Sequence, residues 1–176
     1  MLDAIVEKVG EGHIMQVVTD NVANYKVYGE TLMEKRAKLF WNPCVTHCID
    51  LNLKDLDKKI KVYSDTIAKA KRVTTCIYSR TLVLTRMREC TKGKELIRPR
   101  ATCFAASFMT LRCLNEQKSP LLSWFSYAEW RNNKFEKAKD GKRIARIVLD
   151  TRGLCSNVVA CLNRVLPLLK VLRTVD

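Results

Sequence analysis

The sequence lacks a complete metal-ligand motif, a long apolar run and a segment typical of a secretory signal. It holds two histidines in 176 residues, and no CxxC or HxxxH pair accompanies the CxxH motif of Cys44 and His47. No apolar run approaches the roughly 18 residues of a membrane-spanning helix, and no basic segment followed by an apolar one opens the chain. We therefore expect a soluble, intracellular protein that is not secreted, with its eight cysteines reduced.

Acidic residues are scarce in the second part of the chain. Residues 1–60 carry 8 basic and 9 acidic side chains, whereas residues 61–176 carry 24 basic and 9 acidic side chains. A field of this sign favours polyanions such as nucleic acid. Solvated helix faces with no partner show the same asymmetry, so charge alone leaves both interpretations open.

The apolar pattern of residues 1–60 predicts an α/β fragment. Residues 2–9 have helical spacing that stops at Gly10, and residues 14–20 form a short β-branched run typical of a buried strand. A helix over 22–39, a second strand over 39–44 and a helix from about Thr46 follow, and a right-handed crossover would make the strands parallel neighbours. The helix over 22–39 is weakened by Gly29, and its expected apolar face comprises Val22, Tyr25, Tyr28, Leu32 and Met33.

Residues 61–176 are predicted to be all helical. We expect one long basic helix over 64–90, a helix over 102–115 capped by Thr102, one or two short turns in 119–132, and helices over 141–149 and 153–172. The segments 91–100 and 132–142 are charged and turn-prone. The inward positions of the long helix are Ile67, Ala70, Val73, Ile77, Leu84 and Met87. The chain thus divides into a domain of residues 1–60 and a basic helical region of residues 61–176.

An acid stands at the junction between the first strand and the helix after it. Asp20 ends the run IMQVVTD and precedes Asn21. A carboxylate placed there lies at the carboxyl edge of a sheet, where open α/β folds gather their ligands. Alternatively, Asp20 or Asn21 caps the helix that starts at Val22.

A set of motifs in order carries a family resemblance. The stretches are VVTDNVANY, GETLMEKR, LFWNPCVTHCIDL, AKRVTTCIY and RPRATCFAASFMTL. Together they resemble plant members of the hAT transposase superfamily, and more narrowly the domain of unknown function associated with those transposases. The resemblance implies part of a ribonuclease-H-like core followed by an all-helical insertion, predominantly α overall.

The resemblance also implies a two-metal site held by three carboxylates, with the second carboxylate at Asp20. Only nineteen residues precede Asp20, Asp3 lies in a predicted helix, and the chain stops at Asp176 within the helical region. Cys103 stands where the family has an arginine, before the aromatic Phe104. We therefore expect a truncated, catalytically inactive descendant that is no enzyme and holds no cofactor, with Asp20 vestigial; the intact family uses divalent metal.

Asp20, Cys44 and His47 are weak candidates for metal ligands. CxxH spacing can serve as half of a zinc site, yet a structural zinc site needs four ligands. A packed, hydrogen-bonded corner is the competing interpretation.

The expected function is non-specific DNA binding by the basic helices, in the nucleus by resemblance or in the cytoplasm, with no membrane contact. The alternatives are a protein-interaction scaffold, with a protein partner or a second copy, and a gene fragment without function. The candidate nucleic-acid-binding residues are Lys69, Lys71, Arg72, Arg86, Arg88, Lys92, Lys94, Arg98 and Arg100.

Overall fold

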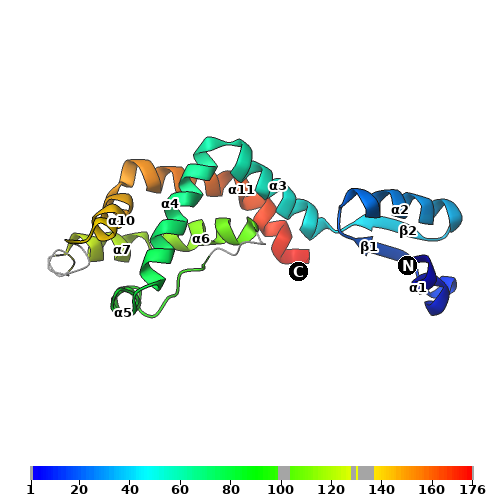
Figure 1. Ribbon diagram of the computed structural model, residues 1–176, viewed down its shortest axis with the longest axis horizontal. Coiled ribbons are helices and arrows are strands. Elements are labelled where there is room, and N and C mark those ends of the chain that lie inside the picture. The colour runs from blue at the N-terminus through cyan, green and yellow to red at the C-terminus, as the bar shows by residue number, and fades with distance from the viewer. Residues whose placement is uncertain (1, 99–103, 128–129, 131–136, 176) are drawn as a thin grey trace. The chain divides into compact units, whose positions relative to one another are not determined.

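The computed structural model describes residues 2–98, 104–127, 130 and 137–175 (Figure 1). The chain forms two compact units: Met1–Asn52 with Val171–Asp176, and Leu53–Lys170. The sequence placed this boundary between residues 60 and 61. The structure is predominantly helical, as predicted, with two parallel strands. The ribonuclease-H-like core stays a prediction.

The first unit alternates helices and strands. In chain order it contains α1 (Leu2–Val9), the 3-10 helix η1 (Glu11–His13), β1 (Gln16–Thr19), α2 (Ala23–Lys35), β2 (Phe40–Pro43) and the start of α3 (Val45–Lys59). β1 pairs in parallel with β2, with Gln16 opposite Phe40 and Thr19 opposite Pro43. The predicted order of elements and the parallel pairing are both confirmed.

A small apolar core holds the first unit together. Val6, Leu32 and Leu39 are at most 2% exposed, and Ile14 and Val17 pack against them. Alternate strand residues face opposite sides of a sheet, and here α2 packs against β2. On the other face Val18 and Phe40 stay exposed.

Gly29 is the point of closest approach between α2 and β2. A Cβ at this position would overlap the indole ring of Trp41. The indole is held in place because its Nε1 donates a hydrogen bond to Thr19 Oγ1 (3.0 Å). Gly29 therefore weakens the helix but allows the packing. The buried side of α2 centres on Gly29 and Leu32, so the predicted apolar face was wrong at Val22 and Tyr25, which are exposed.

Arg36 ties the end of α2 to the N-terminal elements. Its guanidinium donates to Asp3 Oδ1 (2.8 and 3.0 Å), to Glu7 Oε1 (3.3 Å) and to Glu11 Oε2 (2.9 Å). The hydrogen bond from Arg36 holds the pKa of Asp3 below its usual value, and the same bond raises the pKa of Arg36. These hydrogen bonds hold α1 and η1 to the end of α2, in addition to the contacts of the small apolar core.

The second unit is built from helices. They are α4 (Lys61–Tyr78), α5 (Thr81–Cys90), α6 (Phe104–Glu116), α7 (Lys118–Ser126), α10 (Lys139–Leu149), the π-helix η2 (Thr151–Cys155) and most of α11 (Ser156–Val175). One prediction here was wrong, because α7 is a helix where short turns were expected. The predicted helix over 141–149 is confirmed as α10, which begins two residues earlier. The predicted cap Thr102 lies outside the described residues.

The predicted single helix over 64–90 was also wrong, because it is broken at Ser79 and Arg80. Arg80 has an extended backbone (φ −138°, ψ 114°), and Ser79 Oγ donates to the carbonyl of Cys76 (2.9 Å). Serine competes for backbone hydrogen bonds in this way and favours helix ends. The break turns α5 so that Val83 and Met87 are buried and α5 packs against α4 and α7.

The core of the second unit surrounds α4. Ile67, Ala70, Val73 and Ile77 are at most 2% exposed, which confirms their predicted inward positions. α4 packs against α5, α6 and α10. Aromatic rings add to this core: Tyr63 meets Phe108 edge to face, and Trp124, Phe125 and Trp130 form a cluster.

One apolar stretch is longer than the sequence analysis allowed. Among the described residues, Thr151–Thr174 forms a helical stretch of 24 residues that could cross a membrane by length and composition. The expectation that no run approaches this length was therefore wrong. In the structure this stretch is also a core helix, because Val158, Cys161, Val165 and Leu169 are buried at helical spacing along one side.

Candidate functional site

The ends of the two parallel strands bring Asp20 and His47 together. β1 ends at Thr19 and β2 ends at Pro43, and the backbone N–H of Cys44 donates to the carbonyl of Thr19 (2.7 Å). His47 follows in the first turn of α3, with its Nδ1 3.8 Å from Asp20 Oδ1. The Asp20 side chain is 61% exposed. This corner is thus an open carboxylate–imidazole pair that becomes an ion pair when His47 is protonated.

The alternative role of Asp20 or Asn21 as a helix cap was wrong. α2 begins at Ala23, its N-cap residue is Val22, and no side chain makes a capping hydrogen bond there. The only hydrogen bond that the structure gives at the Asp20 backbone is accepted by its carbonyl oxygen from Thr19 Oγ1 (3.2 Å), within the part of the chain that is described. The Asp20 side chain is therefore directed to His47 rather than to the start of α2.

The corner brings together two of its three candidate metal ligands. Within residues 2–98, 104–127, 130 and 137–175, no group of three or more His, Cys, Asp or Glu side chains is arranged to hold a metal ion. Cys44 is a half-buried free thiol. Metal binding by Asp20, Cys44 and His47 stays a prediction. Of these three side chains, Asp20 and His47 lie close to each other.

The predicted nucleic-acid-binding cations differ in their surroundings. Arg86 pairs with Glu89 (2.8 Å) and Arg88 pairs with Glu95 (2.6 Å). These acids offset much of the local charge of α5. Lys92 and Lys94 are exposed in the turn that follows. Arg100 lies outside the described residues.

Arg98 is positioned by a network around Tyr78. Its guanidinium lies over the Tyr78 ring, 5.0 Å from the ring centre. The Tyr78 hydroxyl lies 2.5 Å from Glu95 Oε2 and 2.8 Å from the carbonyl of Leu96. Burial, and then the hydrogen bond to Glu95, raises the pKa of Tyr78 to about 12. The hydrogen bonds from Tyr78 and Arg88 lower the pKa of Glu95.

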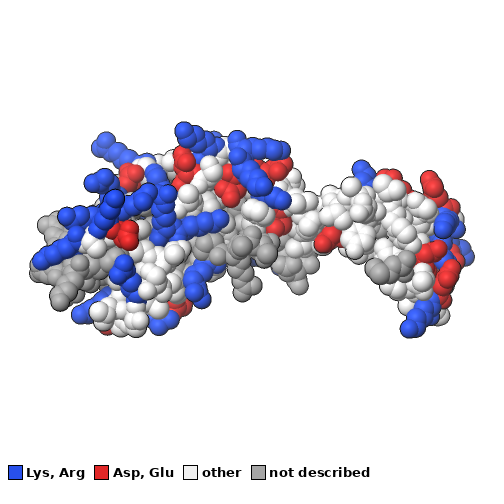
Figure 2. Space-filling model, in the orientation of Figure 1, with Lys and Arg blue, Asp and Glu red and all other residues white. Residues whose placement is uncertain are grey.

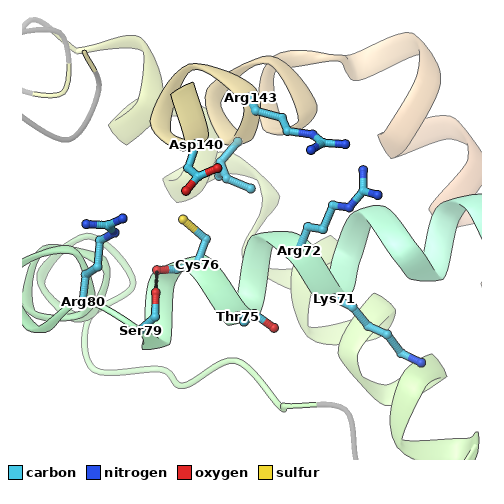
Figure 3. Close-up of a pocket in the computed structure, with 9 residues that line it drawn as sticks. Lys71, Arg72, Thr75, Cys76, Ser79, Arg80, Asp140 and Arg143 are labelled. Atoms are coloured by element: carbon cyan, nitrogen blue, oxygen red, sulfur yellow. Dashed lines mark hydrogen bonds between the residues drawn. The ribbon is translucent and has the colours of Figure 1, made fainter. Parts of the chain in front are cut away.

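The other predicted cations lie on α4, where two of them border a groove. Lys71 and Arg72 line a hollow of about 390 Å³ between α4 and α10, together with Arg80 and Arg143 (Figure 3). Lys69 is on the same helix. Four cations and one carboxylate, Asp140, are among the residues that line this groove. Figure 2 shows Lys and Arg side chains gathered over the face of the second unit that is in view.

Sequence reasoning missed Arg80 and Arg143. The spacing of Arg72, Cys76 and Arg80 puts them on one face of a helix, four residues apart, and this signal was present in the sequence. Arg143 gave no such signal, because its approach to α4 depends on how α10 packs. The groove is therefore a tertiary feature that neither helix predicts alone.

Comparison with known proteins adds one match. The family described as Domain of unknown function (DUF659) matches residues 1–73. The match includes Asp20, Cys44 and His47 and ends one residue after Arg72. No curated protein and no solved structure matches the chain. Residues 1–73 are thus similar to a domain found in hAT-type transposase-like proteins.

Proposed function

We propose that this chain binds DNA through the phosphate backbone and does not cleave it. The observation that supports the proposal is the cation-rich groove between α4 and α10, whose lining contains one carboxylate, Asp140, and four cations: Lys71, Arg72, Arg80 and Arg143. Binding to phosphates releases counterions and needs no contact with base edges. On this proposal, the protein derives from a transposase and still binds DNA, but it does not recognise a specific DNA sequence.

The absence of cleavage is proposed from the chemistry of the Asp20 corner. Two-metal catalysis of phosphoryl transfer needs ligands that hold two ions about 4 Å apart, on both sides of the reacting phosphate. Asp20 faces an imidazole, and the described residues place no third His, Cys, Asp or Glu side chain with the pair. Asp20 is therefore a vestigial member of an active site in this chain.

The test is fluorescence anisotropy with two duplexes of equal length and unrelated sequence. The proposal expects equal affinities, because backbone phosphates are the same in both. A tenfold preference for one duplex would mean that bases are read, and no binding at about 50 mM salt would reject DNA as the partner.

A matched pair of variants locates the interface. Lys71→Ala with Arg143→Ala removes two cations that line the groove, one on α4 and one on α10, and Lys26→Ala with Lys38→Ala removes two exposed cations from the first unit. Both pairs change the net charge equally. We expect the first pair to weaken binding about tenfold or more at 0.1 M salt, and the second pair to have a much smaller effect. Equal losses would show that net charge, rather than the helical surface, drives the association.

A further inference from the structure

The groove between α4 and α10 has a defined arrangement of charges. Arg72 reaches in from α4 and Arg143 from α10, and their guanidinium groups point into the same space (Figure 3). Arg80 lies at the other end, and the Asp140 carboxylate lies between the two ends. Lys71 and Thr75 point away from the space between the two arginines. The groove therefore has one end where two arginines meet.

Within the described part of the chain, these two arginines differ from four others, which each have a carboxylate partner. Arg36, Arg86, Arg88 and Arg112 each form an ion pair with an Asp or Glu side chain. No ion pair joins Arg72 or Arg143 to a carboxylate among the residues that the structure describes. Two guanidinium groups that face the same space repel each other. An anion placed between them removes this repulsion.

The remaining lining groups add no further negative charge at this end. Burial raises the pKa of the Cys76 thiol, so the thiol stays neutral at physiological pH. The Ser79 hydroxyl donates to the carbonyl of Cys76. Asp140 repels an anion from the centre of the groove, which restricts the anion to the space between Arg72 and Arg143.

The chemistry of the two arginines selects the kind of anion. A guanidinium is planar and presents paired N–H donors that match the oxygens of a phosphate group. Two guanidinium groups from opposite helices supply donors to more than one phosphate oxygen. The hollow of about 390 Å³ has room for a phosphate together with the groups attached to it.

We propose that the Arg72–Arg143 end of the groove is a binding site for one phosphate group, clamped between α4 and α10. If the bound phosphate belongs to DNA, it is an internal phosphodiester of the backbone, and the inference then rests on the proposed function. If the bound phosphate belongs to a small molecule, the inference does not depend on the proposed function.

The first measurement uses inorganic pyrophosphate as the probe. The arginine side-chain Nε–H signals of the full chain, labelled with ¹⁵N, are recorded during a titration and assigned with Arg72→Lys and Arg143→Lys. We expect the signals of Arg72 and Arg143 to shift together and to saturate. The signals of Arg86 and Arg112 should shift little, because these two guanidinium groups already bind carboxylates. Equal, non-saturating shifts of all arginine signals would overturn the site, whether or not DNA binds.

The second measurement compares two double variants in duplex binding. Arg72→Ala with Arg143→Ala removes the clamp, and Arg86→Ala with Lys94→Ala removes the same charge from α5 and the turn after it. The site predicts a loss of affinity at least about tenfold greater for the clamp variant at 0.1 M salt. Equal losses of duplex affinity in the two double variants would show that this site does not bind a backbone phosphate. A retained pyrophosphate response without any duplex binding by the unmodified chain would reject the proposed function and leave a site for small phosphates.

Discussion

Gly29 of α2 lies directly against the indole ring of Trp41 on β2, so closely that a methyl group at Gly29 would overlap the ring. Trp41 cannot retreat freely, because its Nε1 is hydrogen-bonded to Thr19 Oγ1. This contact holds α2 against the sheet. Asp20 directly follows β1 of this sheet, and His47 lies in the first turn of α3, just after β2.

Gly29→Ala is expected to destabilise the first unit. Alanine improves the intrinsic stability of a helix by about 1 kcal/mol over glycine, but overpacking against a fixed ring costs about 1–3 kcal/mol. The net effect should be a lower free energy of opening for the α2 amides in native-state hydrogen exchange. Gly12→Ala is the control, because a Cβ there meets nothing within 4 Å. A Gly29→Ala variant as stable as this control would show that the contact is loose.

Asp3→Asn should weaken the first unit at neutral pH and make its stability less sensitive to acid. Arg36 lowers the pKa of Asp3, so this carboxylate contributes stability above its unfolded pKa of about 3.9. That contribution is lost as the pH falls through the still lower pKa of the folded state. Thermal unfolding measured from pH 7 to pH 2 should show a difference between variant and parent that disappears at the acid end.

Glu7→Gln serves as the comparison for Asp3→Asn. The Glu7 side chain is 68% exposed and its contact with Arg36 is longer, at 3.3 Å. Exposed ion pairs contribute little, so Glu7→Gln should have the smaller effect. The reverse order would mean that Arg36 is held mainly by Glu7 rather than by Asp3.

Tyr78 should ionise later than an ordinary tyrosine. Its pKa is raised to about 12 by burial and by the hydrogen bond to Glu95, whereas unfolded tyrosine ionises near 10. The folded state is therefore destabilised as the pH rises from about 10 to 12, because only the unfolded chain gains the ionised form there. An absorbance titration of tyrosinate should show one late-ionising group that Tyr78→Phe removes. Loss of a group that ionises near 10 in the variant, rather than of the late-ionising one, would contradict the network around Arg98.

Asp20→Ala should leave the behaviour of the chain toward DNA unchanged. If Asp20 is vestigial, incubation of a labelled duplex with Mg²⁺ or Mn²⁺ gives no cleavage with either form, and the two bind the duplex equally. Metal-dependent cleavage that disappears in Asp20→Ala would show instead that this corner assembles a working two-metal site.

Local patterns in the sequence predicted much of the first unit. The β-branched run before Asp20 and the helical spacing around Leu32 led to the correct order of elements and to parallel strands. Helix propensity, which describes an isolated helix, predicts that Gly29 weakens α2. The packing role of Gly29 depends on Trp41, twelve residues later. Such a contact cannot be read from the pattern of either element.

The second unit shows where periodicity fails. The spacing of Ile67, Ala70, Val73 and Ile77 predicted the buried side of α4, but the same spacing concealed the break at Ser79. The nine candidate cations are those that lie close together along the chain. The structure pairs Arg86 and Arg88 with glutamates and brings Arg143, from a distant helix, to Arg72. Density in sequence is therefore a poor guide to which charges meet a ligand.

The measurement that most directly tests DNA binding by this chain is the salt dependence of its affinity for a short duplex. Each phosphate neutralised by the protein contributes about −0.9 to the slope of log K against log salt. Because four cations line the α4–α10 groove, we expect DNA binding with a slope of about −3 or steeper. A slope near zero, or no binding at about 50 mM salt, would contradict it and leave the positive charge as a solvated surface.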